Sequence, residues 1–236
     1  MVNQYGDRVT TCRLDVTDAA AARSAVEFGR TTFGRVDVVV NNPGYANSAP
    51  VEETSEEDFR AQVEANFFGV VNVTRAALPL LHCQRTGHIV QISPVGGRVG
   101  GSPGIAAYQA SKFAVAGFSE ALAAEVAPLG IKVTIVEPGA LRTDRAGSSM
   151  AIAAVGPDYD ATVGAMNRRR AGFHRSAPGD PVRAARAIIE VVTTDNPPRR
   201  LLLGSDALDA AIRKSRDQIA EAERWAELSR STDFSD

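Results

Sequence analysis

The sequence predicts an α/β fold, in which a parallel sheet is flanked by helices, built as a single domain over residues 1–236. Short runs rich in β-branched residues alternate along the chain with longer segments whose apolar residues recur every three or four positions. Such an alternation is typical of strands joined by helical crossovers, which make the strands parallel. The runs VDVVV (36–40) and KVTIV (132–136) are apolar without strict alternation, as expected for central strands covered on both faces.

The elements follow one another in a regular order. The strands are expected at RVTTCRLDV (8–16), VDVVVNN (36–42), HIVQIS (88–93), KVTIVEP (132–138) and RRLLLGS (199–205). The helices between them are expected at 18–33, 55–82, 108–129 and 180–194. Residues 140–180, rich in Ala, Gly, Ser and Arg, predict a flexible flap over a substrate or a short helical insertion. Residues 205–236 predict a C-terminal helix with a thin apolar stripe, followed by a tail.

Composition excludes several classes of function. Lys and Arg total 26 against 28 Asp and Glu, so a net charge of -2 gives no general attraction for nucleic acid or for an anionic membrane. No apolar run reaches the roughly 18 residues that span a bilayer, and the N-terminus has no signal-peptide core. The two cysteines form no CxxC pair and the three histidines do not cluster, so we expect no metal site and a cytoplasmic protein.

Six segments carry a resemblance to a known family. They are LDVTD (14–18), NNPGY (41–45), EANFFG (64–69), HIVQIS (88–93), YQASK (108–112) and EPGALRTD (137–144). In this order and spacing they resemble the short-chain dehydrogenase/reductase family, from about Val9 to Phe234. The resemblance implies a Rossmann-like sheet, a small-molecule substrate and chemistry at a carbonyl or hydroxyl group.

The candidate catalytic residues include a tyrosine and a lysine four positions apart. On a helix Tyr108 and Lys112 lie one above the other, so that the ammonium favours the phenolate and the pair can exchange a proton with a substrate oxygen. The resemblance adds Asn66, which would support the lysine through water, and a serine after the HIVQIS strand, for which Ser93 is the candidate.

The resemblance also marks a cofactor path. Five residues match positions that would line a dinucleotide if one binds: Asp15, Asn41, Pro138, Gly139 and Thr143. Without the resemblance, Asp15 would be interpreted as a strand-end cap and the Pro138–Gly139 pair as an ordinary turn.

Three departures from the family pattern affect cofactor binding or carbonyl polarisation. The family's glycine-rich phosphate loop should lie upstream of LDVTD, where 13 residues precede Leu14, so we expect the first βαβα unit to be absent and no cofactor to bind this chain alone. Pro94 stands where relatives carry the catalytic serine, and it offers no hydroxyl. Pro43 removes a backbone N–H beside the cofactor path.

The absent unit has a structural consequence. If RVTTCRLDV pairs directly with VDVVV as a right-handed βαβ unit, one sheet face loses its helices. Large exposed apolar patches are rare on monomers, so we expect a second copy, a partner chain or a rearranged terminal helix to cover that face.

Three functional hypotheses follow. The first is an atypical enzyme that uses Tyr108 and Lys112 for dehydration, cyclisation or isomerisation without hydride transfer. The second is an NAD(P)-dependent carbonyl reductase or alcohol dehydrogenase. The third is a non-catalytic partner subunit that keeps the fold for association.

Overall fold

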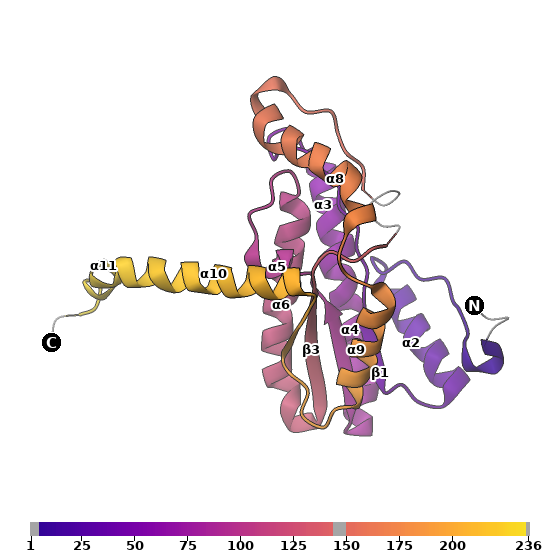
Figure 1. Ribbon diagram of the computed structural model, residues 1–236. Coiled ribbons are helices and arrows are strands. Elements are labelled where there is room, and N and C mark those ends of the chain that lie inside the picture. The colour runs from indigo at the N-terminus through magenta and orange to yellow at the C-terminus, as the bar shows by residue number, and fades with distance from the viewer. Residues whose placement is uncertain (1–4, 144–149, 235–236) are drawn as a thin grey trace.

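A computed structural model describes residues 5–143 and 150–234, and it shows one parallel sheet between layers of helices (Figure 1). The sheet has the order β1-β2-β3-β4, with each strand parallel to its neighbour. Its strands are β1 (Val38–Asn41), β2 (Gly87–Ile92), β3 (Ile131–Pro138) and β4 (Arg200–Leu203). Four of the five predicted strands and the predicted α/β class are therefore confirmed.

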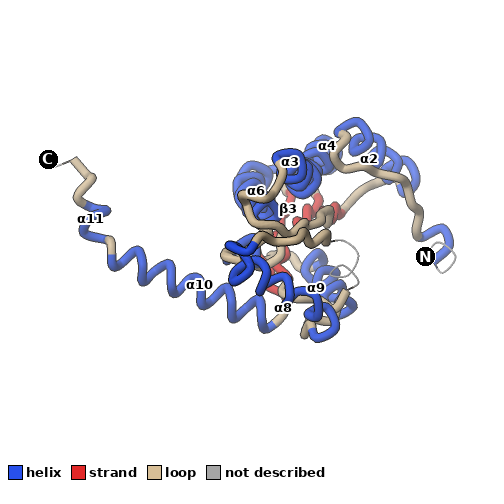
Figure 2. Tube along the Cα trace, turned by 90° about the horizontal axis from the view of Figure 1, so that it is seen from above, coloured by secondary structure: helices blue, strands red, loops and turns tan. Residues whose placement is uncertain are grey.

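The helices lie on both sides of the sheet, as Figure 2 shows from above. On one side are α2 (Ala19–Phe33), α3 (Glu56–Val63), α4 (Gly69–Gln84) and α6 (Ala106–Val126), and on the other is α9 (Pro181–Thr193). Asp18 caps α2 and Asp180 caps α9, each carboxylate accepting two backbone N–H groups of the first turn. These helices confirm the crossovers expected from the apolar periodicity.

The main core lies between the sheet and the pair α4 and α6. Leu81 of α4, Ile89 of β2 and Leu122 of α6 are buried there together. Burying an aliphatic side chain of this size stabilises the fold by about 1.5–3 kcal/mol. Small residues such as Ala77 and Ala123 let both helices approach the strands closely.

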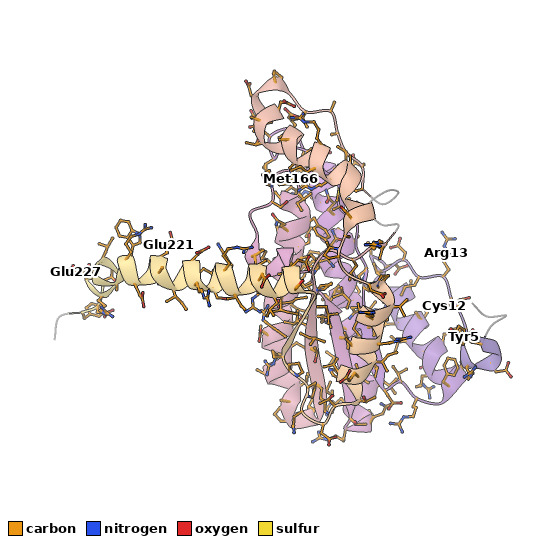
Figure 3. All side chains as sticks on the ribbon, in the orientation of Figure 1. Tyr5, Cys12, Arg13, Met166, Glu221 and Glu227 are labelled. Carbon is orange, nitrogen blue, oxygen red and sulfur yellow. The ribbon has the colours of Figure 1, made fainter. Side chains whose placement is uncertain are left out.

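The prediction of a strand at residues 8–16 is wrong. Residues 9–15 form no regular element, and Figure 3 shows Cys12 and Arg13 in a segment at the edge of the molecule. The end of this segment is held by α4 instead of the sheet, because Val16 packs against Gly69 and the Asn72 amide donates to the Val16 carbonyl over 3.0 Å. The proposed pairing of this segment with VDVVV is therefore also wrong.

Among the described residues, β1 is an edge strand with apolar side chains at its surface. Val38 is 38% exposed and Val40 is 49% exposed. The C-terminal helix follows β4, at the opposite edge of the sheet, and projects away from the body (Figure 1). Cover of the bare sheet face by a second copy or by a partner chain stays a prediction.

The described part of the segment 140–180 is largely helical. It contains η4 (Pro157–Tyr159), η5 (Asp160–Gly164) and α8 (Ala165–Ser176), while residues 144–149 lie outside the described chain. The Tyr159 hydroxyl donates to Glu52 over 2.5 Å, and this carboxylate raises the pKa of the phenol. Arg170 donates to Ser48, Ser102 and the Pro103 carbonyl, and burial lowers the pKa of its guanidinium. Polar contacts thus fasten the segment to the loops above the sheet.

The chain ends in two helices, α10 (Ser205–Arg224) and α11 (Ala226–Arg230). They confirm the expected C-terminal helix. No helix in the described ranges combines the length and apolar character that spanning a membrane requires.

Candidate active site

A cavity opens at the carboxyl ends of the strands, where parallel α/β sheets bind their ligands. Its volume is about 570 Å³. Most of its wall is apolar, and it is formed by Asn42, Ala46, Ile92, Pro94, Gly96, Tyr108, Val136, Pro138, Gly139, Ala140, Leu141, Thr143, Met150, Ala177, Pro181, Ala184, Ala185, Ile188 and Leu203. Tyr108, Pro138, Gly139 and Thr143 of the predicted site lie in this wall.

The tyrosine and lysine meet at the cavity as the helical spacing predicts. Tyr108 lies in the wall and is 9% exposed, whereas Lys112 is buried below it at 2%. The Lys112 Nζ lies 5.9 Å from the centre of the Tyr108 ring. It donates to the carbonyls of Pro43 and Ile92 over 3.0 and 3.2 Å. These two carbonyls fix the ammonium beside the phenol.

Asn66 lies in a single π-helical turn, η2 (Glu64–Phe68), between α3 and α4. Such turns are often found at functional sites. The Asn66 side chain is fully buried and makes two hydrogen bonds of 2.9 Å, accepting from the N–H and donating to the carbonyl of Tyr45. Gly44 has a φ of +147°, and a Cβ there would lie 2.6 Å from the Asn66 oxygen and 3.3 Å from the Lys112 Nζ. Asn66 and Lys112 therefore hold the same loop from two sides.

Ser93 does not line the cavity. It is buried, and its hydroxyl donates to the Lys112 carbonyl over 2.9 Å. The neighbouring Pro94 lies in the wall instead. The hypothesis that Ser93 polarises a substrate oxygen thus finds no support in this geometry, because the hydroxyl is engaged with the backbone of α6.

Two of the expected cofactor residues also lie outside the cavity wall. Asn41 is buried and its amide donates to Thr74, whereas the next residue, Asn42, lines the cavity. Asp15 is exposed and accepts from the N–H and the hydroxyl of Thr17, and this bonding lowers the pKa of its carboxyl. Asn42 could have been found from the alternation of side chains along a strand, which turns neighbouring residues to opposite faces.

The turn after β3 is held by a residue that the motifs did not mark. Asp206, in the first turn of α10, accepts the Ala140 N–H over 2.8 Å, and its other oxygen is buried with no hydrogen-bond partner in the described chain. A Cβ on Gly139 would overlap this carboxylate. The wall of the cavity and the start of the C-terminal helix are therefore packed together without spare room.

Gly139→Ala is expected to destabilise the fold by about 1–3 kcal/mol, because the added methyl group forces the turn and Asp206 apart. Thermal unfolding measures the change. In an Asp206→Ala background the same substitution should cost less, since the clashing carboxylate is gone. Gly117→Ala is the control, because Gly117 in α6 has nothing within 4 Å of an added Cβ. An equal loss in both backgrounds would contradict the contact.

A cluster of charged side chains surrounds Glu137, which directly precedes the Pro138–Gly139 turn. Glu137 is 1% exposed and pairs with Arg98 over 3.0 Å and with Arg200 over 2.6 Å. Arg200 also pairs with Glu120 over 2.7 Å. The cluster joins α5 (Gly96–Val99), β3, β4 and α6. Sequence reasoning missed it, since nothing in the spacing of these residues indicates that they meet.

No group of three His, Cys, Asp or Glu side chains in residues 5–143 and 150–234 is arranged to hold a metal ion.

The sequence is similar to one protein family and to several known proteins. Residues 1–151 match a protein family described as short chain dehydrogenase. An oxidoreductase of Botryotinia fuckeliana, BOA17, is 48% identical over 97% of this chain and 84% of its own length. A 3-ketodihydrosphingosine reductase of Bacteroides thetaiotaomicron is 38% identical over 81% of this chain and 71% of its own length.

A solved structure is similar as well. The crystal structure of a short-chain dehydrogenase from Streptomyces avermitilis matches with a TM-score of 0.90 and 40% identity. The match covers 99% of this chain and 84% of that chain, so it includes the C-terminal helices.

Proposed function

The chain belongs to the short-chain dehydrogenase family, and from this premise we propose that it is an NAD(P)-dependent oxidoreductase that reduces a carbonyl group or oxidises the corresponding alcohol. The observation that carries the proposal is the Tyr108 phenol in the wall of the cavity, with the buried Lys112 ammonium held beside it. Relatives named as oxidoreductases and as a ketone reductase support it.

The cavity fits the nicotinamide end of a dinucleotide. Its wall combines the Pro138–Gly139 turn, Thr143 and several small apolar side chains, which suit a flat ring, with one phenol for proton exchange. Such a cofactor supplies the hydride when it is bound. The diphosphate end needs backbone N–H donors of the kind found at a helix N-terminus. The wall residues named here are assigned only to the nicotinamide end, and none of them is assigned to the diphosphate.

The proton chemistry can be assigned to this chain's own residues. Tyr108 donates a proton to the carbonyl oxygen during reduction and accepts it from the hydroxyl during oxidation. Lys112 stabilises the phenolate that remains after donation, because an ammonium held by two carbonyls cannot move away as the charge develops. Asn66 keeps the loop that carries one of these carbonyls in place.

The substrate is inferred to be a ketone or alcohol with apolar substituents. Apart from Asn42, Tyr108 and Thr143, the side chains of the wall are apolar, so a charged substrate would lose its hydration without gaining a partner there. The name of the Bacteroides relative, a 3-ketodihydrosphingosine reductase, agrees with this class.

The hypothesis of acid–base catalysis without hydride transfer rests on the expected lack of the glycine-rich phosphate loop together with Pro94 and Pro43, and the relatives do not support it. The expectation that this chain alone binds no cofactor competes with this proposal, and one experiment decides between them. Calorimetric titration with NADPH and with NADH should give saturable binding at micromolar levels, and a panel of apolar ketones should consume the bound cofactor. Absence of binding, together with Tyr108-dependent turnover of a substrate without nicotinamide, would overturn the proposal in favour of the non-hydride enzyme.

A further inference from the structure

The C-terminal helix α10 forms an arm that leaves the body of the molecule. Only its first turns pack, where Ala207 and Ala211 are buried against the body. Figure 3 shows Glu221 and Glu227 on the part that projects well away from the remaining elements. Most of the stability of helices in proteins comes from packing an amphipathic face, so a partner surface would stabilise the projecting part of α10.

The exposed side of the arm carries an apolar seam. Leu208 is 47% exposed, Ile212 is 41% exposed and Ile219 is 59% exposed. Together with Ser215 and Ala222 of the same helix they follow a spacing of four, three, four and three residues. This is the repeat of helices that pack side by side along a narrow seam. The small residues would let two backbones approach closely.

The charged residues along one side of the seam indicate that a second, antiparallel copy of the helix covers the seam. Asp209 and Arg216 follow the seam positions 208 and 215, and neither has an ion-pair partner in the described chain. In an antiparallel pair of identical helices this flank faces the same flank of the second copy. Pairing Leu208 with Ile219 of the second copy sets Asp209 beside Arg216, and by symmetry this contact occurs twice.

Other alignments are worse. Pairing Leu208 with Ala226 would set Arg216 against Arg216 of the second copy and Asp209 against Glu223. An alignment that matches Arg216 with Glu223 leaves Leu208 outside the overlap. Only the first alignment covers all three large apolar residues and places opposite charges together.

We propose that the arm is a homodimerisation element, in which α10 packs antiparallel against α10 of a second copy of this chain. The seam of Leu208, Ile212, Ser215 and Ile219 is buried, and two Asp209–Arg216 ion pairs set the register. Trp225 and Leu228, which are 53% and 62% exposed, then reach past the first turn of the second copy's helix toward its body.

Sedimentation equilibrium of the whole chain, measured over a range of concentrations, tests the proposal. The unaltered protein should dimerise. Asp209→Arg or Arg216→Asp alone should raise the dimer Kd about tenfold or more, because each places like charges in contact twice. The double variant Asp209→Arg/Arg216→Asp should restore the dimer Kd to within about threefold, since it recreates both pairs.

The matched control is Asp217→Arg, a charge reversal on the side of the helix opposite the seam, which should leave the dimer Kd unchanged. If a single variant lost its dimer because it misfolded, the double variant would not restore the dimer. Circular dichroism checks separately that each single variant keeps its helices. A protein that stays a single copy at every concentration would overturn the proposal. So would a dimer that is indifferent to the single reversals and to Ile219→Glu, or a double variant as weak as the single variants combined.

Discussion

Replacing Tyr108 with Phe is expected to lower kcat/KM for carbonyl reduction by about 10²–10⁴-fold, the usual contribution of a positioned general acid. The substitution removes one hydroxyl and keeps the ring in the cavity wall, where Tyr108 is nearly buried. The substrate oxygen then has no protein proton donor among the side chains of the wall other than Asn42 and Thr143. Steady-state kinetics with an apolar ketone and saturating NADPH measures the loss.

Two further measurements separate chemistry from structure in that experiment. The Tyr108→Phe variant should bind NADPH with an unchanged Kd, because the hydroxyl acts on the substrate oxygen. Tyr5→Phe removes a phenol from an exposed position outside the cavity wall, and its rate should equal that of the unaltered enzyme. If Tyr108→Phe keeps more than about a tenth of the activity, Tyr108 is not the general acid.

Glu137→Ala is expected to lower the free energy of unfolding by about 3–5 kcal/mol, the usual cost of removing one partner of a buried ion pair. The substitution leaves Arg98 and Arg200 without the carboxylate that both contact at 3.0 and 2.6 Å. In a chain of this size about 1 kcal/mol shifts Tm by roughly 2–4 °C, so Tm should fall by roughly 6–20 °C. Differential scanning calorimetry and guanidinium unfolding measure the two quantities.

The control for Glu137 is Glu120→Ala in the same cluster. The Glu120 side chain is 40% exposed and pairs with Arg199 and Arg200 at the surface. Solvent weakens such pairs, so its removal should cost only about 0–1 kcal/mol. Equal losses at the two positions would show that burial of Glu137 does not set its contribution.

The sequence predicted the parts of the site that depend on local geometry. The four-residue spacing of Tyr108 and Lys112 fixes their relative position on any α-helix, and the structure places the tyrosine in the cavity with the lysine below it. The runs of β-branched residues likewise predicted the four strands that form, and the apolar periodicity predicted the helices between them. The strand at 8–16 was wrong because a run of β-branched residues forms a strand only where a neighbour completes the ladder, and the described chain offers none beyond β1.

The sequence by itself determined the α/β order, the family and the Tyr108–Lys112 pair, because each depends on residues that are close along the chain. Only the tertiary structure decided that Ser93 bonds to α6 while Pro94 faces the cavity, and that Asn42 lines the wall in place of Asn41. It alone brought Asp206 to Ala140, and Arg98 and Arg200 to Glu137. These contacts join residues from different elements, and their partners are set by how the sheet and helices pack, which no local spacing encodes.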